Sequence, residues 1–120
     1  MLLLISQTIL LFSHIAVIWY IAVIMTFNLT LLLCDNMLVS STTLAAEIFQ
    51  FAEAMARASR GPHTKLRVRW VSIDGKPVQT SAGFQLTPTH AIDDRFTSDL
   101  IHIPALWRNP RPAVANNQAY

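Results

Sequence analysis

Charged side chains are missing from the beginning of this 120-residue chain, because residues 1–34 contain no Asp, Glu, Lys or Arg. The nine basic and seven acidic residues all lie between Asp35 and Arg111, and they leave a net charge of +2. A positive charge this small and this scattered does not form the basic patch that nucleic-acid binding needs. We therefore expect no direct binding of nucleic acid by this chain.

Cysteine is also scarce, and the histidines do not have the spacing of metal ligands. Cys34 is the only cysteine, which excludes an internal disulfide and a multi-cysteine zinc site and fits a reducing compartment such as the cytoplasm. The four histidines show no close pairing of the HxxxH kind; they are His14, His63, His90 and His102. The sequence predicts neither a metal site nor another cofactor.

The uncharged N-terminal segment, residues 1–25, is long enough for a transmembrane helix, which needs about 20 mostly apolar residues. It has no basic residue before the apolar stretch and no small-residue cleavage site after it, so a secretory signal peptide is disfavoured. Two interpretations stay open. Either residues 1–25 are an apolar helix that anchors a cytoplasmic chain to the membrane, or Met25 is the true start and the preceding residues are an upstream extension.

Residues 26–120 follow the pattern of an α/β domain. Leu29 to Cys34 is a continuous apolar run, which is typical of a strand buried on both faces. Leu66 to Ile73 predicts a second strand, with Arg67 and Arg69 on a solvent-facing side at its beginning. Leu100 to Ile103 predicts a third buried strand, which Pro104 ends. We expect these strands in one sheet, with the Leu29 and Leu100 strands parallel.

A helix is predicted from Thr42 to Ser59, with N-capping side chains among residues 40–43 and an end at Gly61-Pro62. Four apolar residues at spacings of four, three and four predict the stripe that covers the sheet; they are Leu44, Ile48, Phe51 and Met55. The opposite side is predicted to face solvent, with a Glu53–Arg57 ion pair; it carries Glu47, Gln50, Glu53 and Arg57.

A β-hairpin is predicted after the second strand. Asp74-Gly75 is a favoured pair for a tight turn, because both positions tolerate positive φ. Residues 78–86 would then return antiparallel to the second strand, with Gly83 as a bulge. Residues 113–120 carry no pattern of core residues.

Three passages resemble one known family. Residues 72–83 (SIDGKPVQTSAG) match a DGxPVxTSxG hairpin, residues 98–105 (SDLIHIPA) match a DLIxxPA strand, and residues 44–49 (LAAEIF) lie where a PLEVF-like first helix is found. The chain resembles the ThiJ/PfpI-like domains, relatives of class I glutamine amidotransferases, as they occur in the N-terminal sensor half of AraC/GlxA-type transcriptional regulators. The resemblance implies a partial flavodoxin-like parallel sheet with a β-hairpin.

The resemblance also implies that this chain is not an enzyme. Family enzymes carry a cysteine on a sharp elbow after the strand that follows the one at Leu100, and the chain stops before that strand. Cys34 ends the first strand and is interpreted as a small buried residue. The enzymes also carry a glutamate in the loop after the first strand, whereas residues 35–40 contain none. We therefore assign no catalytic, cofactor-binding or metal-binding residue.

The favoured hypothesis is a truncated ligand-sensing or interaction domain without DNA-binding helices, which takes a small-molecule ligand and self-associates. The alternative is a small single-pass membrane protein with a cytoplasmic α/β segment. His102 is interpreted as a core histidine, and His63 and His90 as loop residues. The one basic cluster is interpreted as solvated charge; it consists of Arg57, Arg60, Lys65, Arg67 and Arg69.

Overall fold

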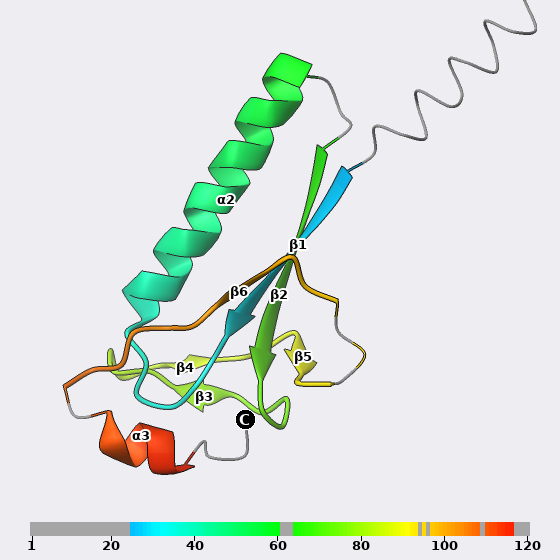
Figure 1. Ribbon diagram of the computed structural model, residues 1–120. Coiled ribbons are helices and arrows are strands. Elements are labelled where there is room, and N and C mark those ends of the chain that lie inside the picture. The colour runs from blue at the N-terminus through cyan, green and yellow to red at the C-terminus, as the bar shows by residue number, and fades with distance from the viewer. Residues whose placement is uncertain (1–24, 61–63, 94, 96, 109, 117–120) are drawn as a thin grey trace, which may run out of the picture.

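The computed structural model describes residues 25–60, 64–93, 95, 97–108 and 110–116 (Figure 1). A four-stranded parallel sheet has the order β5-β2-β1-β6. Its strands are β1 (Met25–Leu32), β2 (Thr64–Ser72), β5 (His90–Ala91) and β6 (Leu100–His102). The prediction of one sheet with parallel Leu29 and Leu100 strands is confirmed, since these two residues pair directly.

The central strand β1 is buried because both of its neighbours are in the sheet and a helix covers one face. Leu29 and Leu31 pack against Ala46 of α2 (Val39–Arg60). Beyond the end of β1, Leu33 and Met37 form a second apolar cluster with Val78. The core therefore follows β1 and continues past its carboxyl end.

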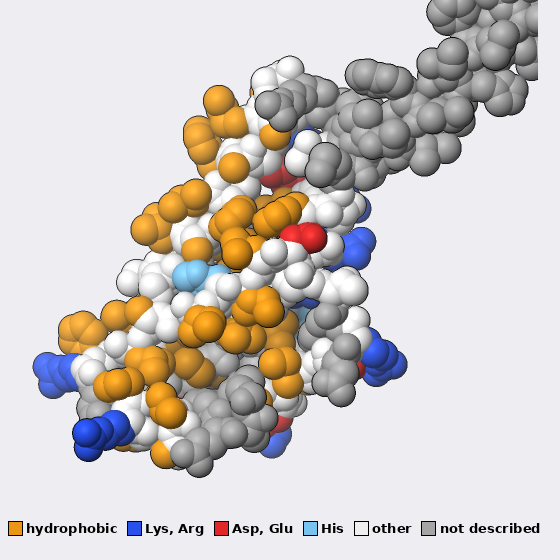
Figure 2. All heavy atoms as spheres, in the orientation of Figure 1, with side chains coloured by type: hydrophobic (Ala, Val, Ile, Leu, Met, Phe, Trp, Pro, Cys, Tyr) orange, Lys and Arg blue, Asp and Glu red, His pale blue; other side chains and the backbone are white. Residues whose placement is uncertain are grey.

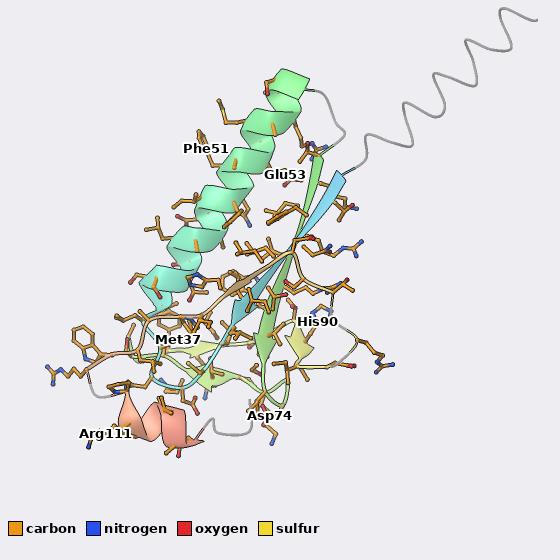
Figure 3. The ribbon with its side chains drawn as sticks, in the orientation of Figure 1. Met37, Phe51, Glu53, Asp74, His90 and Arg111 are labelled. Carbon is orange, nitrogen blue, oxygen red and sulfur yellow. The ribbon has the colours of Figure 1, made fainter. Side chains whose placement is uncertain are left out.

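The side of α2 that covers the sheet differs from the predicted one. Ala46 is 3% exposed, whereas the predicted stripe faces solvent, with Phe51 68% exposed and Leu44, Ile48 and Met55 each more than half exposed. Leu29 and Leu31 of β1 meet the helix at the small Ala46 and the partly buried Phe49, and burying this side of α2 turns the opposite stripe to solvent. Figure 3 shows Phe51 pointing away from the sheet and Glu53 pointing toward it.

Two local predictions for α2 are also wrong. The helix begins at Val39, so residues 40–43 lie inside its first turns, where the Ser41 and Thr43 hydroxyls donate to backbone carbonyls of Leu38 and Val39 at 2.7 and 3.0 Å. The Glu53 carboxylate faces the sheet and accepts from the backbone N–H of Leu66 at 2.8 Å. The predicted end of the helix at Gly61-Pro62 lies outside the described residues.

The hairpin exists, but between other residues. Gly75 turns the chain with φ 74°, yet the antiparallel partners are β3 (Val78–Gln79) and β4 (Gln85–Leu86), in a separate two-stranded sheet. Gly83 stands in the connecting turn with φ 90° and is not a bulge within a strand. Residues 113–116, for which no core pattern was recognised, belong to α3 (Arg111–Asn116), where Ala113 is buried.

The predicted apolar helix of residues 1–25 falls almost wholly outside the described residues, and Met25 begins β1. Among residues 25–60, 64–93, 95, 97–108 and 110–116, no helix has the length and apolarity that crossing a membrane requires.

Removing one buried hydroxyl of α2 is expected to stabilise the fold. Thr42 is 0% exposed, and its Oγ1 atom has no hydrogen-bond partner among the described residues. A buried polar atom without a partner costs about 1–3 kcal/mol, so Thr42→Val is expected to raise the free energy of unfolding by about 1 kcal/mol. Urea denaturation measures this change. Thr43→Val is the control, because the Thr43 hydroxyl is bonded; equal effects of both substitutions would contradict the assignment.

Candidate functional site

The order of the strands places a crevice beside the carboxyl end of β1. The chain leaves β1 through α2 to reach β2 on one side, and it later returns to the other side of β1 as β6. In open parallel sheets, ligands bind outside the carboxyl ends of strands at such a switch point. Figure 1 shows α3 and the β3–β4 hairpin gathered at this end of the sheet.

The loop after β1 is hydrogen-bonded to two other segments that border the crevice. Asp35 accepts from the Gln79 backbone N–H at 2.9 Å, and the Asn36 N–H donates to the Gln79 carbonyl at 2.8 Å. The Asn36 side-chain amide donates to the Trp107 carbonyl at 3.2 Å, and the Trp107 N–H donates to the Asn36 carbonyl at the same distance. Asn36 has φ 64°, a left-handed conformation that asparagine tolerates better than most residues. The loop thus joins β1 to the hairpin and to the segment after β6.

An apolar cavity of about 230 Å³ lies at the switch point itself. Leu33 and Cys34 after β1, Ile103 and Pro104 after β6, and Ala113 and Val114 of α3 line it. This cavity is therefore bounded by β1, β6 and α3, three elements that are far apart in the sequence.

A more polar cavity of about 350 Å³ adjoins the first and shares Leu33 and Cys34 with it. The Lys76 ammonium lies 3.2 Å from the Asp74 carboxylate, whose other oxygen accepts from the Lys76 N–H at 3.1 Å. These hydrogen bonds from Lys76 lower the pKa of Asp74, which is exposed. Asp35 also lines this cavity. The polar lining carries two carboxylates and one ammonium group.

Cys34 stands where the two cavities meet, and it is half-buried. Burial, followed by the negative charge of Asp35, raises the pKa of its thiol. A thiol with a raised pKa stays protonated at neutral pH and is a poor nucleophile. The interpretation of Cys34 as a small, inert side chain agrees with this environment, although it is less buried than expected.

The other residues considered from sequence do not join this site. The His102 Nε2 atom is buried without a hydrogen-bond partner among the described residues, while His90 is exposed and contacts Thr89 at 2.8 Å. His14 and His63 lie outside the described residues. In the basic cluster, Arg69 donates to the Thr97 carbonyl at 3.1 Å. Glu47 is exposed on α2.

Several residues of the site were missed from sequence. Asp35 and Asn36 were recognised only as a loop signal, and their bonds to Gln79 and Trp107 join residues more than 40 positions apart. Ala113 carries no signal of its own, because its burial depends on how α3 lies against the end of the sheet. Local periodicity holds no information on either arrangement.

A larger cavity, of about 430 Å³, lies under α2 at the amino-terminal ends of β1 and β2. The rings of Phe27 and Phe49 stack there with centroids 5.9 Å apart. Its two carboxylates, Glu53 and Asp99, already accept backbone N–H groups of Leu66 and Asn28, at 2.8 and 2.7 Å. We therefore interpret both carboxylates as acceptors for backbone N–H groups of the strands, and not as ligand-binding groups. The candidate site is placed at the switch point.

No protein-family model and no curated protein matches the chain. Among solved structures, an AraC family transcriptional regulator from Pseudomonas putida is similar at 18% identity and a TM-score of 0.56, over 78% of this chain and 55% of its own. A putative transcriptional regulator from Vibrio parahaemolyticus is similar at 16% identity and a TM-score of 0.57, over 77% and 45%. A DJ-1 superfamily protein from Agrobacterium tumefaciens is similar at 17% identity and a TM-score of 0.44, over 78% and 48%.

The chain thus spans about half the length of the structures it resembles. At these identities the similarity shows the fold, and that fold is the α/β fold expected from the ThiJ/PfpI-like resemblance.

Proposed function

We propose that the chain is a ligand-sensing domain of the kind found in AraC-type regulators, and that it binds a small molecule at the switch point between β1 and β6. The observation that carries this proposal is the open apolar cavity between α3 and the residues that follow β1 and β6, beside a polar one. Small-molecule sites commonly combine a mostly apolar lining with a few polar groups that orient the ligand. We do not propose that this chain itself contacts nucleic acid.

The two linings favour an amphiphilic ligand. Its apolar part would contact Ile103 and Val114, and its polar end would lie toward Asp35 and the Asp74–Lys76 pair. Because the Lys76 ammonium is already paired with Asp74, the Asp35 carboxylate gives the polar cavity a net negative charge. Amines and alcohols are therefore expected to bind better than carboxylic acids.

Filling the apolar cavity is expected to abolish this binding. Ala113 is buried against the cavity, so the larger side chain of Ala113→Leu would occupy it. Ala115→Leu is the matched control, because Ala115 is exposed on the same helix. Short-chain amines and alcohols are expected to raise the melting temperature of the parent chain and of Ala115→Leu, but not of Ala113→Leu. Equal shifts in all three proteins, or no shift in any, would refute the proposed site.

We also propose that the chain has no acyl or amide hydrolase activity, which the raised pKa and partial burial of Cys34 support. Hydrolysis of nitrophenyl esters and anilides is expected to match the uncatalysed rate. Turnover that disappears in Cys34→Ala would instead identify Cys34 as a nucleophile.

A further inference from the structure

The short helix α3 borders both cavities of the candidate site. Ala113 and Val114 line the apolar cavity, and Asn116 lines the polar one. From the other side, Leu33 and Cys34 after β1 border both cavities as well. Among the described residues, these are the two segments that the two linings share. A movement of α3 relative to the end of β1 would therefore change both cavities at once.

The apolar cavity is open to solvent. Val114 is 56% exposed and Ile103 is 75% exposed, although both line the cavity. Figure 2 shows hydrophobic side chains at the surface at this end of the molecule. In the described part of α3, Ala113 is the buried side chain, so little apolar area holds the helix in place. A movement of α3 toward Ile103 would remove the apolar surface of Val114 from water, which is favourable.

The segment that leads to α3 is held firmly as far as Trp107. The Leu38 N–H donates to the Ala105 carbonyl at 2.8 Å, and the Ala105 N–H donates to the Ser41 hydroxyl at 3.1 Å. Trp107 exchanges two hydrogen bonds with Asn36, both of 3.2 Å. A movement of α3 must therefore arise after Trp107.

Arg108 is the described residue at which the chain can turn. Its φ is 61°, in the left-handed region that arginine rarely occupies. Beyond it, Pro110 and Pro112 have φ values fixed by their rings, which stiffens the start of α3. The observed position of α3 therefore depends on an unfavourable backbone conformation at Arg108. A return of this φ to negative values would move the helix as a unit.

We infer that α3 is a lid over the switch-point site, hinged at Arg108, and that the structure shows the lid open. Closure carries Val114 toward Ile103, over the apolar part of the ligand, and Asn116 over its polar end. The inference rests on the proposed function for the ligand that the lid encloses, whereas the movement itself can be measured without a ligand.

Two substitutions of Arg108 are expected to shift the lid in opposite directions. Valine is β-branched and disfavours positive φ, so Arg108→Val favours closure, whereas asparagine tolerates positive φ, so Arg108→Asn favours the open position. Both remove the guanidinium that lies 5.6 Å from the centroid of the Trp107 ring. Their comparison therefore isolates the effect of the backbone.

The Cys34 thiol is a native reporter of the lid, because it lines the apolar cavity and belongs to the only cysteine of the chain. Without ligand, N-ethylmaleimide is expected to modify Cys34 about threefold or more slowly in Arg108→Val than in Arg108→Asn. Equal rates, or faster modification in Arg108→Val, would overturn the inference. Circular dichroism checks that both variants fold. If Arg108→Val does not, Arg108→Asn is compared with the parent chain, and faster modification in Arg108→Asn is expected; the same rate in both would refute the hinge.

Calorimetric titration with hexylamine separates the lid from the site. The dissociation constant is expected to be about threefold or more lower in Arg108→Val than in Arg108→Asn, because closure retains the ligand. No binding to the parent chain would refute the proposed site, and the rates of Cys34 modification would then decide on the hinge alone. Equal affinities together with unequal rates of modification would show that α3 moves without enclosing the ligand, and would refute its role as a lid.

Discussion

Ala46→Asp is expected to prevent folding of the chain. Ala46 is 3% exposed and packs against Leu29 and Leu31 of the central strand. An aspartate there would bury an unpaired charge under the helix, which costs about 3–5 kcal/mol. Far-UV circular dichroism and the chemical-shift dispersion of NMR spectra would show the loss of the folded state.

Ile48→Asp on the same helix is the matched control. Ile48 faces away from the sheet and is exposed, so this substitution is expected to change the free energy of unfolding of the monomer by less than about 0.5 kcal/mol. The measurement is made at dilute concentration, so that association of the chain does not contribute. If Ile48→Asp unfolded the chain and Ala46→Asp did not, the sheet would contact the stripe predicted from the sequence, and the observed packing of α2 would be wrong.

The chain is expected to unfold at low temperature, with a midpoint below about 45 °C. Eight hydrophobic residues are buried among the described residues, while twelve large ones are exposed. The exposed ones include Leu100 and Ile101 of β6, whose outer edge has no partner strand in the described sheet. So little buried apolar area offsets chain entropy only narrowly, and an unpaired apolar edge favours association.

Differential scanning calorimetry at several protein concentrations measures this stability. A broad, low-temperature transition accompanied by aggregation is expected. A monodisperse monomer that unfolds cooperatively above about 65 °C, the upper end for ordinary mesophilic domains, would contradict the prediction.

The existence and pairing of the strands could be predicted from their apolar runs, since β1 and the run at Leu100 pair in parallel as expected. The burial of the Leu100 strand was predicted wrongly. It is an edge strand of the described sheet, so Leu100 and Ile101 are exposed. In β2 the alternation at Arg67 and Arg69 gives way to buried Val71 and Ser72, so the strand enters the core as predicted.

The covering face of α2 could not be predicted, because the helix carries two candidate faces. Hydrophobicity ranks Leu, Ile, Phe and Met above Ala and Thr, so the larger residues were assigned to the sheet. Ala46 and the partly buried Phe49 pack against Leu29 and Leu31 instead, and Thr42 is buried as well. Which face is buried therefore depends on side chains of another element.

The strand pairing of the hairpin and the contacts of the candidate site could not be predicted from local sequence either. The turn at Gly75 was predicted from local preferences, whereas the pairing of β3 with β4 depends on contacts with the loop after β1. The bonds that join Asn36 to Gln79 and Trp107 cross the whole domain and have no local signature.

Chemical-shift mapping of the full chain with a short-chain amine tests the central claim most directly, because it locates the ligand. The account predicts shifts of amide signals at Leu33, Cys34, Ile103 and Val114, around the switch-point cavity. Shifts confined to Phe27, Phe49 and Leu66, around the larger cavity under α2, would place the ligand at the opposite end of the sheet and contradict it.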